Sequence, residues 1–146
     1  MANKVLYTAK ATVTGGRADG HGVTSDGQLD VHLRPPIETG GDGQGTNPEE
    51  LFAVGYAACF EGALGAVGRR RKIELGEVSI DSRVSLITAE DRSYNVAVEL
   101  HVTLPDISDA EQGKAIVADA HKVCPYSNAT RGNVEVTLIA NGQPVG

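Results

Sequence analysis

Residues 47–71 read NPEELFAVGYAACFEGALGAVGRRR, and this segment predicts one long helix around which the rest of the fold is organised. Asn47 can accept a hydrogen bond from a free backbone N–H of the first turn, and Pro48 loses nothing at the first helical position. Two glutamates follow where the helix dipole favours negative charge. The middle is rich in alanine and glycine, although each glycine costs about 1 kcal/mol relative to alanine in a helix interior. We therefore expect close packing against another element.

Three short strands are expected before this helix, as an antiparallel meander. Residues 4–14 place apolar side chains at every second position, which is the period of a strand with one covered face. The dipeptide Asp26-Gly27 is a hairpin signal between two further short alternating runs. Pro35-Pro36 ends the third strand, and a glycine-rich connection leads from there to the helix.

A second hairpin, a second helix and a closing strand are expected after the long helix. Apolar residues alternate over 78–86 and again over 96–104. The polar run at 108–111 fits a capping box with Ser108 as the cap. The helix that it opens must end before Pro125, because proline disfavours helical geometry in the residue before it. Residues 134–139 then form the last strand.

The fold class is therefore α+β, with largely antiparallel sheets, a long central helix and a second helix in the order β-β-β-α-β-β-α-β. The chain has 146 residues, of which 40% are hydrophobic. This is the size of one ordinary domain with a core of its own, so we expect residues 1–146 to form a single domain.

Charge and hydropathy restrict the classes of partner. Lys and Arg total 13 against 19 for Asp and Glu, and the net charge of −6 disfavours binding to a phosphate backbone. Residues 1–5 hold no basic segment followed by an apolar run, and no stretch is expected to reach the roughly 18 apolar residues of a membrane helix. We expect a cytoplasmic protein that binds neither nucleic acid nor membranes.

Two cysteines, Cys59 and Cys124, are the side chains best suited to chemistry. Cys59 lies inside the long helix and Cys124 at the end of the second helix. Taken singly, each is typical of a packing residue, since free cysteine is among the most buried residue types. A zinc site with His101 and His121 would lack the paired-ligand spacing of such sites, so we expect no bound metal.

Three strings around these cysteines resemble the organic hydroperoxide resistance (Ohr) family of the OsmC/Ohr superfamily. They are GGR at 15–17, NPEELFAVGYAACF at 47–60 and CPYSNATRGN at 124–133. The order of strands and helices also resembles that family, so the likeness covers almost the whole chain. It implies an intertwined homodimer and a thiol peroxidase that reduces alkyl or lipid hydroperoxides.

The resemblance implies roles for four residues. Cys59 falls on the peroxidatic cysteine, whose thiolate becomes a sulfenic acid, and Cys124 falls on the resolving cysteine that forms a disulfide with it. Arg17 falls on the catalytic arginine that favours the thiolate, and Glu49 would pair with its guanidinium. No bound cofactor is implied. An external dithiol, dihydrolipoamide or a lipoylated protein, would reopen the disulfide.

Helix geometry places the site between two subunits. Glu49 and Cys59 are ten residues apart, which is about 15 Å along an unbroken helix. They cannot meet within one chain. We therefore expect Arg17 and Glu49 of one subunit to complete the site around Cys59 and Cys124 of the other.

Two other functions stay open at this stage, as do the roles of two charged residues. An OsmC-type peroxidase would use a broader range of substrates, whereas a thiol redox sensor or binding protein would use the cysteine pair as a switch without turnover. Glu61 is expected to be exposed, because it lies on nearly the opposite helix face from Cys59. Arg131 is expected to have a role in its own loop.

Overall fold

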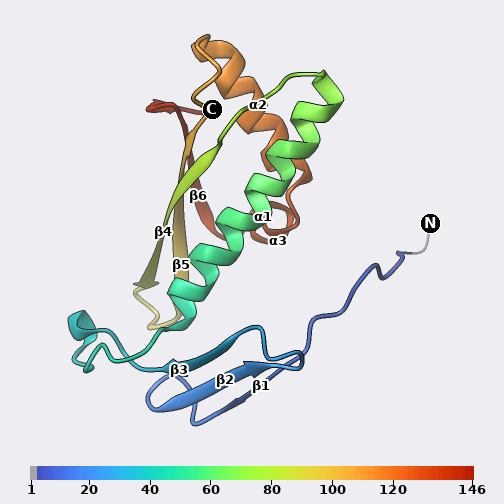
Figure 1. Cartoon of the computed structure of the whole chain (residues 1–146). Coiled ribbons are helices and arrows are strands. Elements are labelled where there is room, and N and C mark those ends of the chain that lie inside the picture. The colour runs from blue at the N-terminus through green and yellow to red at the C-terminus, as the bar shows by residue number, and fades with distance from the viewer. Residues whose placement is uncertain (1–2) are drawn as a thin grey trace. The chain divides into compact units, whose positions relative to one another are not determined.

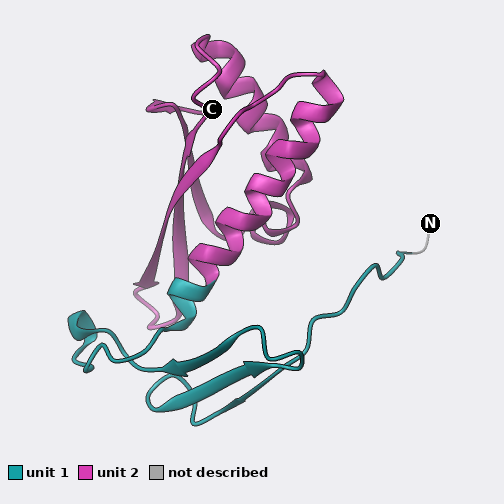
Figure 2. Ribbon diagram, in the orientation of Figure 1, with its two compact units in different colours: residues 1–51 teal, residues 52–146 magenta. Residues whose placement is uncertain are grey.

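The computed structural model describes residues 3–146, in which strands and helices are mixed along the chain as an α+β fold (Figure 1). Met1 and Ala2, part of the N-terminal segment considered above, lie outside the described residues. The chain divides into two compact units, Met1–Leu51 and Phe52–Gly146 (Figure 2). The single domain expected from the chain length stays a prediction.

The first unit is built on a three-stranded antiparallel sheet. Its strands are β1 (Ala11–Thr14), β2 (Gly20–Thr24) and β3 (Asp30–Leu33), in that order across the sheet. Asp26 holds the turn between β2 and β3, because its carboxylate accepts hydrogen bonds from the Thr24 hydroxyl at 2.7 Å and the Gln28 backbone N–H at 3.0 Å. The predicted meander is confirmed.

The first strand is shorter than its alternating pattern predicts. Pairing with β2 begins at Ala11, opposite Thr24, and residues 3–10 form no strand. Neither face of β1 is covered within the unit, and Val5, Leu6 and Tyr7 are also exposed. An alternating pattern forms a strand only beside a neighbouring strand and a covering layer, and the pairing with β2 reaches these residues only at Lys10, whose carbonyl oxygen accepts from the Ser25 N–H at 2.9 Å.

Helix α1 (Pro48–Arg71) has the predicted bounds and the predicted cap. The Asn47 side-chain oxygen accepts from the Glu50 backbone N–H at 2.8 Å. A short 3-10 helix, η1 (Ile37–Thr39), precedes α1 and was not predicted. The close packing expected of the glycines is present at Gly68, where an added Cβ would lie 3.1 Å from the Ile73 carbonyl oxygen.

The expectation that no segment is apolar enough to cross a membrane needs correction. Helix α1 passes that test by length and composition, with a mean hydropathy of 1.5 over its best window, because alanine and glycine count as apolar. One such helix is weak evidence, since the core helix of a soluble protein passes the same test. Six residues of α1 are buried in the structure, and 33% of the apolar window is buried.

The second unit packs helices against a four-stranded sheet. Its strands are β4 (Ser79–Thr88), β5 (Tyr94–Thr103), β6 (Glu135–Ala140) and β7 (Gln143–Pro144), in the order β4-β5-β6-β7. The β5–β6 pair is parallel, and the other two pairs are antiparallel. The predicted hairpin and closing strand are confirmed, whereas β7 was not predicted.

Helices α1 and α2 (Ala110–Val123) lie on the same side of this sheet and share one apolar core with it (Figure 1). Central β5 contributes Val98, Leu100 and Val102, which are at most 1% exposed. The core fixes the helices that carry the two cysteines.

The N-cap of the second helix lies one residue later than predicted. Asp109, not Ser108, is the N-cap, and its carboxylate accepts from the Glu111 and Gln112 backbone N–H groups. Aspartate is as favourable as serine at an N-cap, so the sequence alone did not decide between the two neighbouring residues.

The predicted end of α2 before Pro125 is confirmed, but a second short helix, α3 (Pro125–Thr130), follows at once. Cys124 stands between them with extended backbone geometry, at a ψ of 125°. Proline stops one helix there and begins the next, since it is favourable at a first helical position.

Candidate active site

The structure brings Cys59 and Cys124 together within the second unit. Cys59 comes from α1 and Cys124 from the junction of α2 and α3, and their Sγ atoms lie 3.6 Å apart. Both are free thiols, with Cys59 partly buried and Cys124 fully buried. A disulfide would require about 2.05 Å, so the two sulfurs are in contact but not bonded.

Aromatic side chains form a cluster beside the pair. Phe52 and Tyr126 stack with ring centroids 5.6 Å apart, and Tyr56 meets the Tyr126 ring edge-on at 5.7 Å. Gly55 leaves room for this arrangement, because an added Cβ would lie 3.2 Å from the Tyr126 hydroxyl oxygen. The surroundings are apolar, as predicted for Cys59, and the sequence analysis did not single out these aromatic residues.

A chain of buried polar groups runs behind the cysteines. The Ser127 hydroxyl lies 2.8 Å from the Tyr56 hydroxyl and 2.8 Å from His121 Nδ1. Tyr56 also lies 3.3 Å from the Thr130 hydroxyl. Tyr56 and Ser127 are fully buried. The sequence analysis missed this group, and the signal for it was the polar SNAT segment following a predicted helix end.

Electrostatics in the second unit disfavour a thiolate at Cys59. Burial raises the pKa of the Cys59 thiol, a hydrogen bond from the Tyr126 backbone N–H lowers it in part, and the neighbouring Cys124 raises it again. The net shift is upward. Since the thiolate is the nucleophile, a fast reaction at neutral pH requires an added positive charge.

The predicted Arg17–Glu49 ion pair is present in the first unit. Arg17 Nη2 lies 2.9 Å from Glu49 Oε1, and the Glu49 side chain is only 17% exposed. Arg17 sits in the turn between β1 and β2, which Gly15 shapes with a φ of +75°. An added Cβ at Gly15 would lie 2.2 Å from the Asp19 carbonyl oxygen, so the turn requires glycine there.

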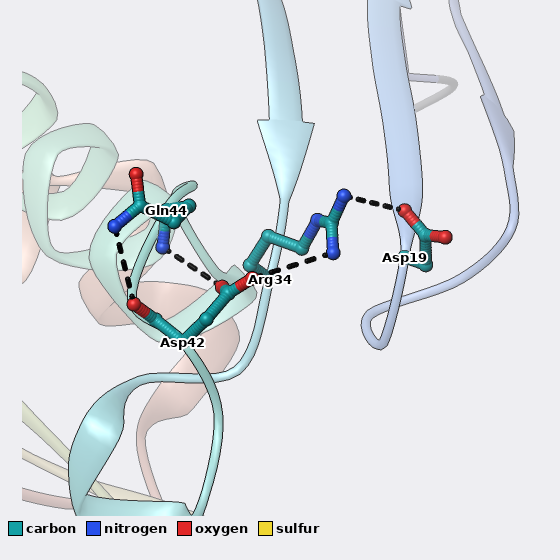
Figure 3. A network of polar contacts seen from close by, with 4 residues as sticks. All are labelled: Asp19, Arg34, Asp42 and Gln44. Carbon is teal, nitrogen blue, oxygen red and sulfur yellow. Dashed lines mark hydrogen bonds and ion pairs between the residues drawn. The ribbon is translucent and has the colours of Figure 1, made fainter.

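A second arginine holds this turn against the connection to α1 (Figure 3). Arg34 Nη2 lies 3.0 Å from Asp19 Oδ1, and its Nη1 lies 3.5 Å from Asp42 Oδ2. Asp42 in turn accepts from the Gln44 backbone N–H at 3.0 Å. Arg34 therefore links the segment that carries Arg17 to the segment that leads into the Glu49 helix. The sequence analysis missed it.

Two further charged residues are placed as expected. Glu61 is exposed on α1. Arg131 follows α3, where its guanidinium donates to Asn128 Oδ1 at 2.7 Å and to the His121 carbonyl oxygen. Arg131 thus fastens its own loop to the end of α2.

Known proteins resemble this chain over most of its length. The OsmC-like protein family model matches residues 40–139. The organic hydroperoxide resistance protein of Xanthomonas axonopodis pv. citri (strain 306) is 56% identical over 137 residues, covering 92% of this chain and 94% of that protein.

Solved structures agree with this relationship. The organic hydroperoxide resistance protein OsmC of Legionella pneumophila, a predicted redox protein, is 48% identical and superimposes with a TM-score of 0.88, covering 93% of this chain and 98% of that one. OhrB of Bacillus subtilis is 46% identical with a TM-score of 0.84, covering 92% and 98%. The resemblance drawn from the three sequence strings is confirmed: the chain belongs to the organic hydroperoxide resistance proteins of the OsmC-like family.

Proposed function

We propose that this chain is a cysteine-based peroxidase that reduces organic hydroperoxides to alcohols. The observation that carries the proposal is the 3.6 Å contact between the Cys59 and Cys124 sulfurs, with Cys59 partly open and Cys124 buried. A peroxide can reach the first thiol from outside, while the second stands within reach of the oxidised product. Membership of a family named for organic hydroperoxide resistance supports the same chemistry.

The reaction has two steps. The Cys59 thiolate attacks one peroxide oxygen, the O–O bond breaks, and the alkoxide leaves and takes up a proton to become the alcohol. Cys59 is then a sulfenic acid. The Cys124 thiol attacks its sulfur, an S–S bond forms, the S–O bond breaks, and the thiol proton leaves with the hydroxyl as water. Two thiols thereby supply the two electrons that reduce one peroxide.

The aromatic cluster supports an organic substrate. Phe52, Tyr56 and Tyr126 form a cluster of aromatic rings, and the Tyr126 backbone N–H donates to the Cys59 thiol. An alkyl chain leaving water for such surface gains hydrophobic stabilisation that hydrogen peroxide cannot. We therefore propose alkyl and lipid hydroperoxides as the substrates.

Arg17 and Glu49 would complete the site from a second copy of the chain. Helix α1 is continuous from Pro48 to Arg71, so Glu49 and Cys59 are separated by about 15 Å along its axis. Glu49, with Arg17 paired to it, therefore cannot contact the Cys59 of its own chain. In a homodimer, the partner's guanidinium would lie beside Cys59, favour the thiolate and donate to the departing alkoxide.

Exposed apolar surface supports such a dimer. Only 33% of the most apolar part of α1 is buried in the single chain, and Val54 on it is 72% exposed. Apolar side chains of the N-terminal segment are likewise exposed, Leu6 by 87%. A second copy of the chain could cover these exposed apolar side chains.

Renewal of the thiols would need an external dithiol, for which we propose dihydrolipoamide or a lipoylated protein, with no cofactor bound to the chain. A dithiol can attack the Cys59–Cys124 disulfide and then release itself by closing its own ring. We propose a cytoplasmic location, where thiol reductants are available.

Peroxide consumption with a chosen reductant tests the reaction and the reductant together. The purified protein is given cumene hydroperoxide with dihydrolipoamide, glutathione or a thioredoxin system, and the peroxide left is measured over many equivalents. We expect sustained peroxide consumption with dihydrolipoamide and not with glutathione or the thioredoxin system. Cys59→Ser should abolish it, and Cys124→Ser should oxidise once and then stall or over-oxidise.

The alternatives give other results. A redox sensor would consume about one equivalent and stop with every reductant, and a broader OsmC-type enzyme would reduce hydrogen peroxide as fast as cumene hydroperoxide. Full activity of Cys59→Ser would overturn the assignment of the nucleophile.

A further inference from the structure

The Ser127 hydroxyl is the point at which the helices that carry the two cysteines are tied together. It lies 2.8 Å from the Tyr56 hydroxyl on α1 and 2.8 Å from His121 Nδ1 on α2, while Ser127 itself belongs to α3. Ser127 and Tyr56 are fully buried and His121 is partly buried. Buried hydrogen bonds of this kind are strong restraints, because an unpaired partner would lose its solvation without replacement.

Each of these residues stands one helical turn from a cysteine. Tyr56 precedes Cys59 by three residues on α1, and His121 precedes Cys124 by three residues at the end of α2. Residues three apart lie on the same side of a helix. The Ser127 hydroxyl therefore fixes the spacing between two helix faces at the level where the sulfurs meet, 3.6 Å apart.

A neutral His121 can satisfy the hydrogen bonds of this group. Burial lowers the pKa of His121, and the nearby Arg131 charge lowers it further, so the imidazole is neutral near pH 7. A neutral Nδ1 can accept the single Ser127 proton while Tyr56 donates to the Ser127 oxygen. Both of the 2.8 Å contacts are then satisfied, and the group connects α1 through α3 to α2.

We propose that Ser127 is a positioning residue for disulfide formation, which holds Cys124 where it can reach the oxidised sulfur of Cys59. This inference rests on the proposed peroxidase function. It separates the two chemical steps, since the attack of Cys59 on a peroxide forms no bond to Cys124. Condensation of the Cys124 thiol with the sulfenic acid, which releases water, depends on where Cys124 lies.

The variant Ser127→Ala tests the proposal in single-turnover measurements. One equivalent of cumene hydroperoxide is added to the reduced full-length protein, and sulfenic acid and disulfide are followed by quenching and mass spectrometry. Sulfenic acid formation should keep its wild-type rate, while disulfide formation should slow about tenfold or more, because small misplacements of reacting groups are costly. With excess peroxide, sulfinic acid at Cys59 should accumulate in the variant only.

Two further changes separate positioning from general damage. Ser82→Ala removes a serine hydroxyl in β4 that has no hydrogen-bond partner among residues 3–146, and this variant should form its disulfide at the wild-type rate. Tyr56→Phe removes one arm of the group and keeps the ring, so it should slow disulfide formation even if Ser127→Ala fails to fold. His121→Asn keeps a polar atom near the position of Nδ1 and should resolve faster than His121→Ala.

A second measurement distinguishes failure of this inference from failure of the proposed function. Each protein is equilibrated with a glutathione redox buffer, and the disulfide fraction is measured without any peroxide. The equilibrium constant for disulfide formation in Ser127→Ala should be several-fold lower than in the wild type. If the wild type forms no disulfide with peroxide but this shift is present, the peroxidase proposal fails and the positioning role stands. Wild-type behaviour of Ser127→Ala and Tyr56→Phe in both measurements would overturn the positioning role.

Discussion

The Cys59 thiol must lose a proton before it can attack a peroxide, and its surroundings oppose that loss. Burial raises its pKa, and the hydrogen bond from the Tyr126 backbone N–H offsets only part of the effect. A helix end with one N–H cannot replace a full charge. A cation beside the sulfur would therefore decide the rate at neutral pH, and this is the role proposed for Arg17.

Replacement of Arg17 should slow the first step and change its pH dependence. With the guanidinium absent, the pKa of Cys59 should rise further, so fewer molecules carry a thiolate at pH 7. Arg17→Ala is expected to lower kcat/KM for cumene hydroperoxide by about a hundredfold at pH 7, and to recover part of the loss as the pH is raised. Arg17→Lys should keep more activity, because it keeps a positive charge that can pair with Glu49, although it lacks the planar guanidinium.

The measurement is kcat/KM against pH for the wild type and both variants. Arg83→Ala is the control, because this arginine is 69% exposed on β4 and pairs only loosely with Glu99, at 3.9 Å. A profile for Arg17→Ala that keeps the wild-type midpoint would contradict the assigned role.

At the scale of elements, α1 could be predicted because its signals are local in sequence. Contacts between residues far apart in sequence could not be predicted in this way. Asn47 and Pro48 mark the start of α1 through neighbours in sequence. The Tyr56–Ser127 hydrogen bond joins residues 71 positions apart, and no sequence period announces such a contact. The cysteine and Arg17–Glu49 pairs were foreseen through resemblance to a family, because spacing alone left both cysteines as packing residues.

The loops that carry Arg17 and lead to Glu49 depend on a contact of the same non-local kind. Arg34 reaches Asp19 on one side and Asp42 on the other (Figure 3). Its side chain is 37% exposed, so these pairs contribute little to overall stability. Their effect is local: they hold two glycine-rich segments that would otherwise be free to shift.

Replacement of Arg34 should therefore affect activity more than stability. Arg34→Ala is expected to lower kcat/KM for cumene hydroperoxide several-fold, because the Arg17 guanidinium would be held less firmly. The midpoint of urea unfolding should change little. Both quantities are measured beside Arg83→Ala, which removes an arginine of the unit 2 sheet. Equal activities of the two variants would show that Arg34 does not position the turn.

At the scale of the whole molecule, a single chain leaves its most apolar helix largely uncovered. Two thirds of the apolar window of α1 are accessible, and the first sheet has no covered face at β1. The ion pair belongs to the first unit and the cysteines to the second. A homodimer would cover the apolar surface and bring the ion pair of one subunit beside the cysteine pair of the other. The two sites would be related by a twofold axis.

Mixed dimers test whether the site is shared between subunits. One chain carries Arg17→Ala and the other Cys59→Ser, with different affinity tags, and the mixed dimer is purified through both tags after co-expression. If Arg17 acts across the interface, one of the two sites regains every group, and activity should be about half that of the wild type. If Arg17 acts within its own chain, both sites stay defective. The reciprocal dimer, a wild-type chain with a chain that carries both changes, should show the opposite pattern: inactive when the site is shared and half-active when it is not. A mixed dimer no more active than its Arg17→Ala parent, or a fully active monomer, would contradict the shared site and leave the exposed face of α1 to another partner.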